Sequence, residues 1–503
     1  MPDRKQKLFS GRHFTRNVFW NLIGAGAPLL VAIVAIPLLI EGMGLSRFGV
    51  LTIAWMVVGY FSLFDFGLGR ALTKLVAEKL GNGQLEEIPS LIWTAMSLMA
   101  VLGVLGAVVV AAISPWLVND VLNIPSELQN ETLIAFYLLA ASVPVVISST
   151  GLRGVLEAHQ RFGIVNAVRI PLGIFTFIGP LAVLPFSNSL VPVVGVLVFA
   201  RLVSWCAYIV LCLRVEPDLR HVSSINRELV RPLISFGGWM TVSNIVSPLM
   251  VYLDRFLIGV VLSMAAVSYY ATPYEVVTRL LIIPGALMGV MFPAFAAVLV
   301  QDRNRAARLY GRAVNYVFLS LFPMVLIIVA FAYEGLSLWL GNDFAKNSYL
   351  VLQLLAIGVF LNSLANVPFG LVQSAGRPDL TAKLHVIELP FYLLVLWSLL
   401  NTYGIAGVAL AWLLRVSVDT AVLFVMANRM VSIGSGQTVR MFYVAGIALI
   451  ALALGAVIPG LTTKWIFLLL IITLFTVLAW FYILSSDERD KICNCLRCHQ
   501  ATK

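Results

Sequence analysis

Charged side chains are scarce in this chain. Only 12% of its 503 residues are Asp, Glu, Lys or Arg, whereas 60% are hydrophobic and the mean hydropathy is +0.95. Soluble domains carry about 25% charged residues, so this composition excludes a soluble globular protein. The longest loop that we predict to face outward, at about residues 114–131, has fewer than 20 residues and leaves no room for a soluble domain.

Motifs of catalysis and of nucleotide binding are also missing. The chain has no GxxxxGK[ST] loop, which excludes transport driven by ATP bound to this chain. No constellation of residues is typical of an enzyme, so we predict a protein that is not an enzyme and that holds no cofactor and no metal. A regular alternation of apolar and polar residues is absent as well, which argues against a transmembrane β-barrel.

Only five cysteines are present. Two of them, Cys206 and Cys212, fall within an apolar run and are interpreted as packing residues. The others lie beside a histidine in the C-terminal tail: Cys493, Cys495, Cys498 and His499. Residues 495–499 formally match the attachment motif of c-type haem. Because the tail is predicted to be cytoplasmic, free thiols are favoured over a zinc site and over haem.

Apolar runs of about 18 to 26 residues recur from end to end, long enough to cross the ~30 Å hydrocarbon core of a membrane as helices. We therefore predict an all-α polytopic membrane protein with about 14 transmembrane helices. The predicted spans are residues 17–40, 48–69, 90–113, 132–153, 163–184, 191–213, 233–260, 266–298, 312–333, 349–373, 383–400, 404–427, 441–459 and 465–484.

Basic residues separate sharply between alternate loops. One set of loops carries most of the Arg and Lys residues, including the run at 303–312, whereas the other set carries only Arg47, Lys346 and Lys464. By the positive-inside rule the basic set is cytoplasmic, and an even number of spans returns both termini to that side. The net charge of +10 then reflects membrane topology rather than nucleic-acid binding.

A weak internal repeat links the two halves of the chain. Residues 17–78 match residues 236–297 in pattern at a shift of 219 positions, with the turn at 44–49 laid over 263–268. Parallel repeats are typical of transporters whose substrate site lies between two lobes. The predicted parts are an N-terminal six-helix lobe at 1–214, a cytoplasmic linker at 215–232, a C-terminal six-helix lobe at 233–428, two further helices at 429–484 and a cytoplasmic tail at 485–503.

Two charges lie deep within the predicted span 266–298. An ionised side chain near the membrane centre costs at least ~2.5 to 3.5 kcal/mol, so Glu275 and Arg279 are expected to face a protein interior or a watery cavity. They are four residues apart, which places them on one helix face and allows an ion pair. Pro284 cannot donate to the carbonyl of Leu280, which predicts a kink just beyond Arg279. We predict that Glu275 and Arg279 bind substrate.

Two more arginines inside predicted spans are candidate substrate-binding residues. Arg201 has no acidic residue in its own span, so it needs a partner from another helix or an anionic ligand. Arg415 lies four residues before Asp419, and this spacing predicts a pair that neutralises itself.

Four charges near helix ends are predicted to serve in gating or coupling: Asp65, Arg70, Asp254 and Arg255. Each has a structural alternative. Asp65 can instead pair with Arg70 or with a neighbouring helix end. Asp254 and Arg255, which are adjacent and point about 100° apart, can instead snorkel to the membrane interface.

Four stretches together resemble a known family: DFGLGR at 65–70, LDRFLIGVVLS at 253–263, SYYATPYEVVTRL at 268–280 and MFPAFA at 291–296. They look like the Wzx-type oligosaccharide flippases. These belong to the multidrug, oligosaccharidyl-lipid and polysaccharide exporter superfamily, with the MurJ lipid II flippases and the multidrug and toxin extruders. The predicted fourteen spans fit the flippases better than the extruders, which typically have twelve.

The resemblance implies a function in O-antigen or polysaccharide biosynthesis. It implies alternating access that moves an undecaprenyl-diphosphate-linked oligosaccharide from the cytoplasmic to the outer leaflet of the bacterial inner membrane. It also implies a cationic cavity between the lobes and a groove near the last two helices for the lipid tail. The expected partners are the lipid-linked oligosaccharide, membrane lipids, the polysaccharide polymerase or export machinery, and a coupling ion that is either a proton or sodium.

Two other classes compete with this interpretation. A multidrug and toxin extruder shares the two lobes but is expected to use acidic cavity residues for its cationic substrates, whereas three of the mid-span charges here are arginines. A membrane polymerase or ligase for the same glycans is expected to carry a long outward loop with reactive side chains, which this chain lacks. The sequence therefore favours the flippase, with the extruder as the main alternative.

Overall fold

The computed structural model describes residues 28, 30–61, 67–159, 161–220, 229–230, 250, 252–431, 435–483 and 489. Throughout these residues the regular structure is helical, with no β-strand. Most of the predicted span 233–260 and the start of the span 17–40 lie outside the described residues, as does the tail with its cysteines.

Within the described part of the chain, eight helices are long and apolar enough to cross a membrane. They are Leu85–Val121, Ser126–Ala158, Gly163–Val183, Leu190–Val215, Arg303–Ala330, Asn342–Ser374, Asp379–Val431 and Leu461–Phe481. Shorter apolar helices are Leu30–Met43, Leu45–Val57 and Tyr443–Val457. A helix satisfies its own backbone hydrogen bonds, as a span through lipid requires. The predicted all-α polytopic class is confirmed, whereas the number of fourteen spans stays a prediction.

The chain divides into two compact units. The first contains Met1–Thr272 and His385–Val408, and the second contains Pro273–Leu384 and Ala409–Lys503. Two helices, α10 (Met264–Thr278) and α15 (Pro378–Val431), contribute residues to both units. The division into lobes at 1–214 and 233–428 stays a prediction.

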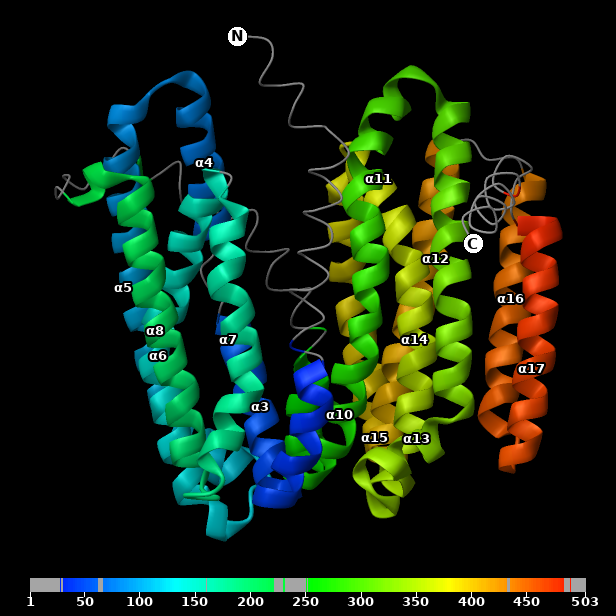
Figure 1. The fold of residues 1–503 in the computed structure, drawn as a ribbon, viewed down its shortest axis with the longest axis horizontal. Helices are drawn as coiled ribbons and strands as arrows, with labels where there is room; N and C mark the ends of the chain where they lie inside the picture. The colour runs from blue at the N-terminus through cyan, green and yellow to red at the C-terminus, as the bar shows by residue number, and fades with distance from the viewer. Residues whose placement is uncertain are drawn as a thin grey trace, which may run out of the picture. The chain divides into compact units, whose positions relative to one another are not determined.

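The first unit is built around α6. Its helices are α3 (Leu45–Phe61), α4 (Leu68–Asn82), α5 (Ile88–Trp116), α6 (Ser126–Ala158), α7 (Phe162–Val183) and α8 (Leu190–Val215). α6 packs closely along α5 and α8, as Figure 1 shows for these labelled helices. A Cβ at Gly103 in α5 would lie 2.6 Å from the Cα of Pro144 in α6, so glycine is required for this close approach.

The second unit is built around α14. Its helices include α11 (Ile282–Gln301), α12 (Arg303–Ala330), α13 (Ala332–Leu340), α14 (Asn342–Ser374), α16 (Ser435–Val457) and α17 (Leu461–Leu478). α11, α12 and α13 all pack against α14. The side chain of Asp302 begins α12 by accepting hydrogen bonds from the N–H groups of Asn304 and Arg305.

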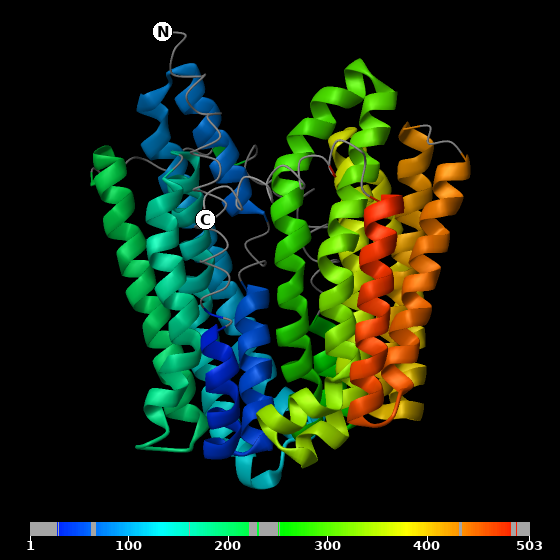
Figure 2. The same cartoon turned by 45° about the vertical axis from the view of Figure 1, so that its right-hand side comes forward.

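The last two helices lie side by side and contact α12 (Figures 1 and 2). Lys464, at the start of α17, forms an ion pair with Glu334 of α13, at 2.7 and 2.9 Å to the two carboxylate oxygens. The amide of Gln353 in α14 donates to the carbonyl of Ala456 at 3.2 Å. Polar contacts as well as apolar packing therefore hold this helix pair to its unit.

α15 joins two of the predicted spans, 383–400 and 404–427. Gly404 separates them with a positive φ of 58° and a non-helical ψ of −139°. A side chain rarely tolerates this conformation, so glycine is the residue that allows the turn between the two helical segments.

Candidate functional site

Glu275 and Arg279 form an ion pair beside a break in the helix. A 3₁₀ turn, η4 (Arg279–Leu281), separates α10 from α11. Pro284 lacks the N–H that would donate to the carbonyl of Leu280, which interrupts the regular hydrogen-bond ladder of the helix at this point. A 3₁₀ turn therefore lies just before Pro284, whereas the kink predicted from this proline stays a prediction.

The ion pair has the geometry that its spacing predicts. Nη2 of Arg279 lies 3.1 Å from Oε2 of Glu275. The two side chains are 35% and 32% exposed, so a ligand can still reach the guanidinium. A guanidinium keeps its charge when desolvated and can hold two phosphate oxygens at once. The pair can therefore bind an anion that competes with Glu275.

The charge pattern predicts that one end of the first unit faces outward, and we call it the predicted outer end. The first turns of α3 and α10 contact each other there. The hydroxyl of Ser268 in α10 donates to the carbonyl of Leu45, the first residue of α3, at 2.7 Å. A Cβ at Gly49 would lie 2.7 Å from the carbonyl carbon of Met264 and closer still to its oxygen. Any side chain at Gly49 would therefore separate the two helix starts.

Asn123 forms a second set of hydrogen bonds at the predicted outer end. Its backbone N–H donates to the carbonyl of Gly259 at 2.9 Å. Its side-chain amide donates to the carbonyl of Val260 at 2.7 Å and to the carbonyl of Leu262 at 3.4 Å. The last carbonyls of a helix have no partner within the helix. Asn123, which follows α5, therefore caps the helix at 252–261.

Asp254 and Arg255 lie inside the protein, with exposures of 0% and 3%. The carboxylate of Asp254 accepts hydrogen bonds from the hydroxyl of Tyr270 at 2.5 Å and from the N–H of Arg255 at 2.6 Å. The guanidinium of Arg255 lies 5.8 Å from the ring centre of Tyr252. Snorkelling needs a charged head group in contact with water, so this burial argues against the snorkelling alternative.

Arg201 of the first unit is half-buried and lines a small cavity. Within the described residues no acceptor contacts its guanidinium. A partner from another helix is therefore not found there, and the alternative of an anionic ligand stays open.

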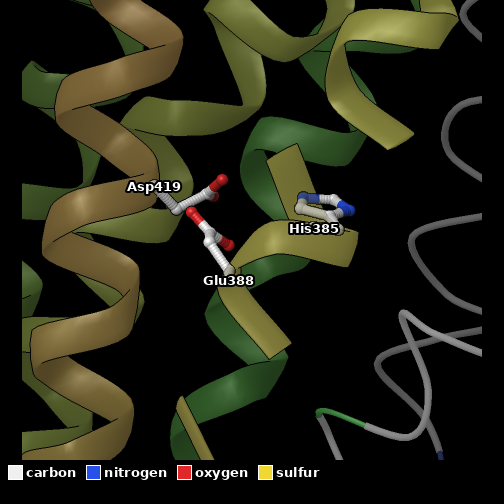
Figure 3. Close-up of side chains that lie close together, drawn as sticks. All are labelled: His385, Glu388 and Asp419. Carbon is white, nitrogen blue, oxygen red and sulfur yellow. The ribbon is translucent and has the colours of Figure 1, made fainter. Parts of the chain in front are cut away.

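A side-chain cluster in α15 was not anticipated from the sequence. His385 and Glu388, both in the first unit, place a ring nitrogen and a carboxylate oxygen within 4.8 Å of each other, and Figure 3 labels both side chains. Glu388 and Asp419 are buried. Carboxylate oxygens and imidazole nitrogens can bind cations or protons. The spacing of three residues places His385 and Glu388 on one helix face.

The remaining predicted residues have no structural test. Arg415 lies one turn before Asp419 on α15, and their pairing stays a prediction. Asp65 and the side chain of Arg70 lie outside the described residues, as does the cysteine cluster of the tail. Conversely, the sequence pattern did not single out Gly49, Asn123 or Ser268, because their contacts join distant segments.

Comparison with known sequences shows a family relationship. The model of a family described as "polysaccharide biosynthesis protein" matches residues 14–299. The chain is also 34% identical over 421 residues to a protein of Shigella flexneri named "putative O-antigen transporter", with 83% of this chain and 98% of the relative covered.

Comparison with solved structures shows the same fold at low identity. A MurJ lipid II flippase in an inward closed conformation matches with a TM-score of 0.70 and 11% identity, covering 92% of this chain and 99% of that one. An inward-facing multidrug resistance transporter of the MATE family matches with a TM-score of 0.69 and 15% identity, covering 80% and 94%. The chain therefore has the fold that these membrane transporters share.

Proposed function

Because the chain belongs to the polysaccharide biosynthesis protein family, we propose that it is a flippase that carries lipid-linked oligosaccharides across the membrane. The observation that carries this proposal is its 34% identity to the putative O-antigen transporter over 98% of that relative. Its substrate is then an oligosaccharide repeat unit on undecaprenyl diphosphate, moved from the cytoplasmic to the outer leaflet of a bacterial inner membrane. Both termini are cytoplasmic in this proposal.

The diphosphate of the carrier is the part of the substrate that needs a cation. Arg279 lies 15 residues after the start of α10, which is about 22 Å along a helix and so deep in the membrane. Its partial exposure leaves room for phosphate oxygens, and its planar guanidinium suits two of them. Glu275 neutralises Arg279 when no substrate is present and gives way when the diphosphate arrives.

Alternating access requires that the outer ends of the helices separate and close. The contact of Ser268 with Leu45 and the capping by Asn123 close the predicted outer end of the first unit. We assign these contacts to an outer gate. Asp254 and Arg255 support the gate because their buried hydrogen bonds fix the helix that Asn123 caps.

A coupling ion, either a proton or sodium, would need oxygen or nitrogen donors inside the membrane. Among the described residues, His385 and Glu388 of the first unit offer such donors close together. Assembly with a polysaccharide polymerase belongs to the same proposal, because the repeat unit must be polymerised after it reaches the outer leaflet.

Complementation of a strain that lacks its own O-antigen flippase tests the proposal. Export of surface glycan should be restored by this chain. Arg279→Lys should impair export if two-pronged phosphate recognition matters, whereas a merely structural pair should tolerate lysine. The double variant Glu275→Gln with Arg279→Gln should fail as well, and normal glycan export by that variant at normal protein levels would refute phosphate binding by Arg279.

The pair of Arg153 and Glu157 in α6 supplies a matched control. It has the same four-residue spacing, with 3.4 Å between its charged groups and side chains that are 44% and 35% exposed. Arg153→Lys changes the same chemical group and should leave export unchanged. A strain that gains drug resistance but exports no glycan would instead favour the extruder.

A further inference from the structure

The cavity beside Arg201 lies among four helices of the first unit. Its lining is Ala54 and Trp55 of α3, Leu139 of α6, Leu172 and Thr176 of α7, and Leu197, Ala200 and Arg201 of α8. Arg201 lies 11 residues after Leu190, about 17 Å along α8, and is therefore near the middle of the membrane. A cation thus lines the cavity at a depth where charge is costly.

Arg201 lacks a compensating charge in the described part of the protein. The cavity lining contains no Asp or Glu, and no ion pair or hydrogen bond joins the guanidinium to any described residue. An unpaired charge this deep in a membrane is costly, and arginine does not lose its proton to avoid the cost. The unpaired guanidinium therefore favours the binding of an anion in the cavity.

Trp55 adds a second hydrogen-bond donor. Its indole N–H is buried and has no acceptor among the described residues. The ring is held by edge contacts with Phe48 and Phe177, at centroid distances of 5.9 and 5.2 Å. The hydroxyl of Thr176 already donates to the carbonyl of Leu172 at 2.9 Å. The cavity thus combines a cation and a fixed N–H donor with otherwise apolar walls.

We propose that this cavity binds one small monovalent inorganic anion, of the size of chloride, between the guanidinium of Arg201 and the indole N–H of Trp55. A water molecule can accept both hydrogen bonds but cannot neutralise the charge. A sugar diphosphate is too large for a small cavity enclosed by four helices. The site lies outside the proposed contact at Arg279, and it holds whether or not the protein is a flippase.

Anion-dependent stability of the purified full-length protein tests the site. The midpoint of thermal unfolding is measured in chloride and in gluconate at equal ionic strength, and the chloride-dependent shift is compared between variants. A ligand at ten times its dissociation constant should raise the midpoint by about 1 to 3 °C. Arg201→Gln should abolish this shift, and Trp55→Phe should weaken the apparent chloride affinity about tenfold or more.

Arg169→Gln is the matched control. It removes the same charge from α7 at an exposed position that does not line the cavity, so it should keep the full shift. Equal midpoints of the wild-type protein in chloride and gluconate would refute the proposal, as would a shift that Arg201→Gln retains. If Arg201→Gln does not fold, anomalous diffraction from crystals of the wild-type protein in bromide tests the site instead. An anomalous bromide peak within hydrogen-bond distance of Arg201 supports the site, and a lone water in that position overturns it.

Discussion

Gly49→Ala is the most direct test of the proposed outer gate. The new Cβ would lie 2.7 Å from the carbonyl carbon of Met264, whereas carbon atoms pack best at about 3.5 to 4.0 Å. The two helix starts must therefore separate by about 1 Å, which also strains the hydrogen bond from Ser268 to Leu45. Overpacking of this kind costs about 1 to 3 kcal/mol, which lowers the ratio of closed to open gate by about 5- to 150-fold.

Thiol labelling reads this ratio directly. In a background without the native cysteines, Ser268→Cys places a thiol at a fully buried position. A membrane-impermeant maleimide added from outside should label it slowly when Gly49 is present and faster by about the same factor with Gly49→Ala. Glycan export should fall, because the transporter then rests with its outer side open.

Two controls make the result interpretable. Gly195→Ala adds the same methyl group in α8, where it meets nothing within 4 Å, and should leave labelling unchanged. A cysteine at Phe186, which is 89% exposed, should be labelled equally in every background. Unchanged labelling at position 268 in the Gly49→Ala protein, with normal export, would refute the gate.

Three further outcomes follow from the contacts. Lys464→Met leaves Glu334 without its ion-pair partner and should lower the free energy of unfolding by about 1 to 2 kcal/mol in a denaturation experiment, with recovery when Glu334→Leu is added. Tyr270→Phe removes a hydrogen bond from buried Asp254 and should cost about 1 to 3 kcal/mol, whereas unchanged stability would show that the hydroxyl is not needed. A periplasmic reporter fused after Lys503 should be inactive, and an active one would overturn the even number of spans.

The sequence predicted most spans because an apolar run is itself the physical requirement for crossing a membrane. The predicted span 90–113 corresponds to α5 (Ile88–Trp116), and 191–213 corresponds to α8 (Leu190–Val215). Hydropathy could not predict α4 (Leu68–Asn82), which is charged, or α13, which has only nine residues. Those helices are stabilised by packing rather than by an apolar run.

The same distinction separates the contacts of the candidate site that the sequence predicted from those that it did not. Glu275 and Arg279 were predicted to pair because the helix itself brings positions four apart together. The contacts of Gly49, Asn123 and Ser268 depend instead on how distant helices pack, which no local period encodes. A glycine in an apolar run has many structural roles, and only its neighbours in space show which one applies.

The predicted repeat nevertheless explains the form of the outer contact. A shift of 219 positions lays Leu45 over Met264 and Gly49 over Ser268, and α3 and α10 begin at the first two of these equivalent positions. Ser268 contacts the carbonyl of Leu45, and Gly49 contacts the carbonyl of Met264. Each repeat therefore uses the same two equivalent positions to contact the other repeat. The contact is thus nearly self-complementary, as expected where two parallel repeats meet.

The two equivalent positions should not respond equally to substitution. Ser268→Gly removes one hydrogen bond and adds no atoms, so it should lower gate closure by about 0.5 to 1.5 kcal/mol, or about 2- to 13-fold. Gly49→Ser adds a Cβ that collides with the carbonyl of Met264, so it should have the larger effect. Labelling of a cysteine at Leu45 compares the two variants in one background. Faster labelling with Ser268→Gly than with Gly49→Ser would show that the hydrogen bond, rather than the close backbone approach, holds the outer end closed.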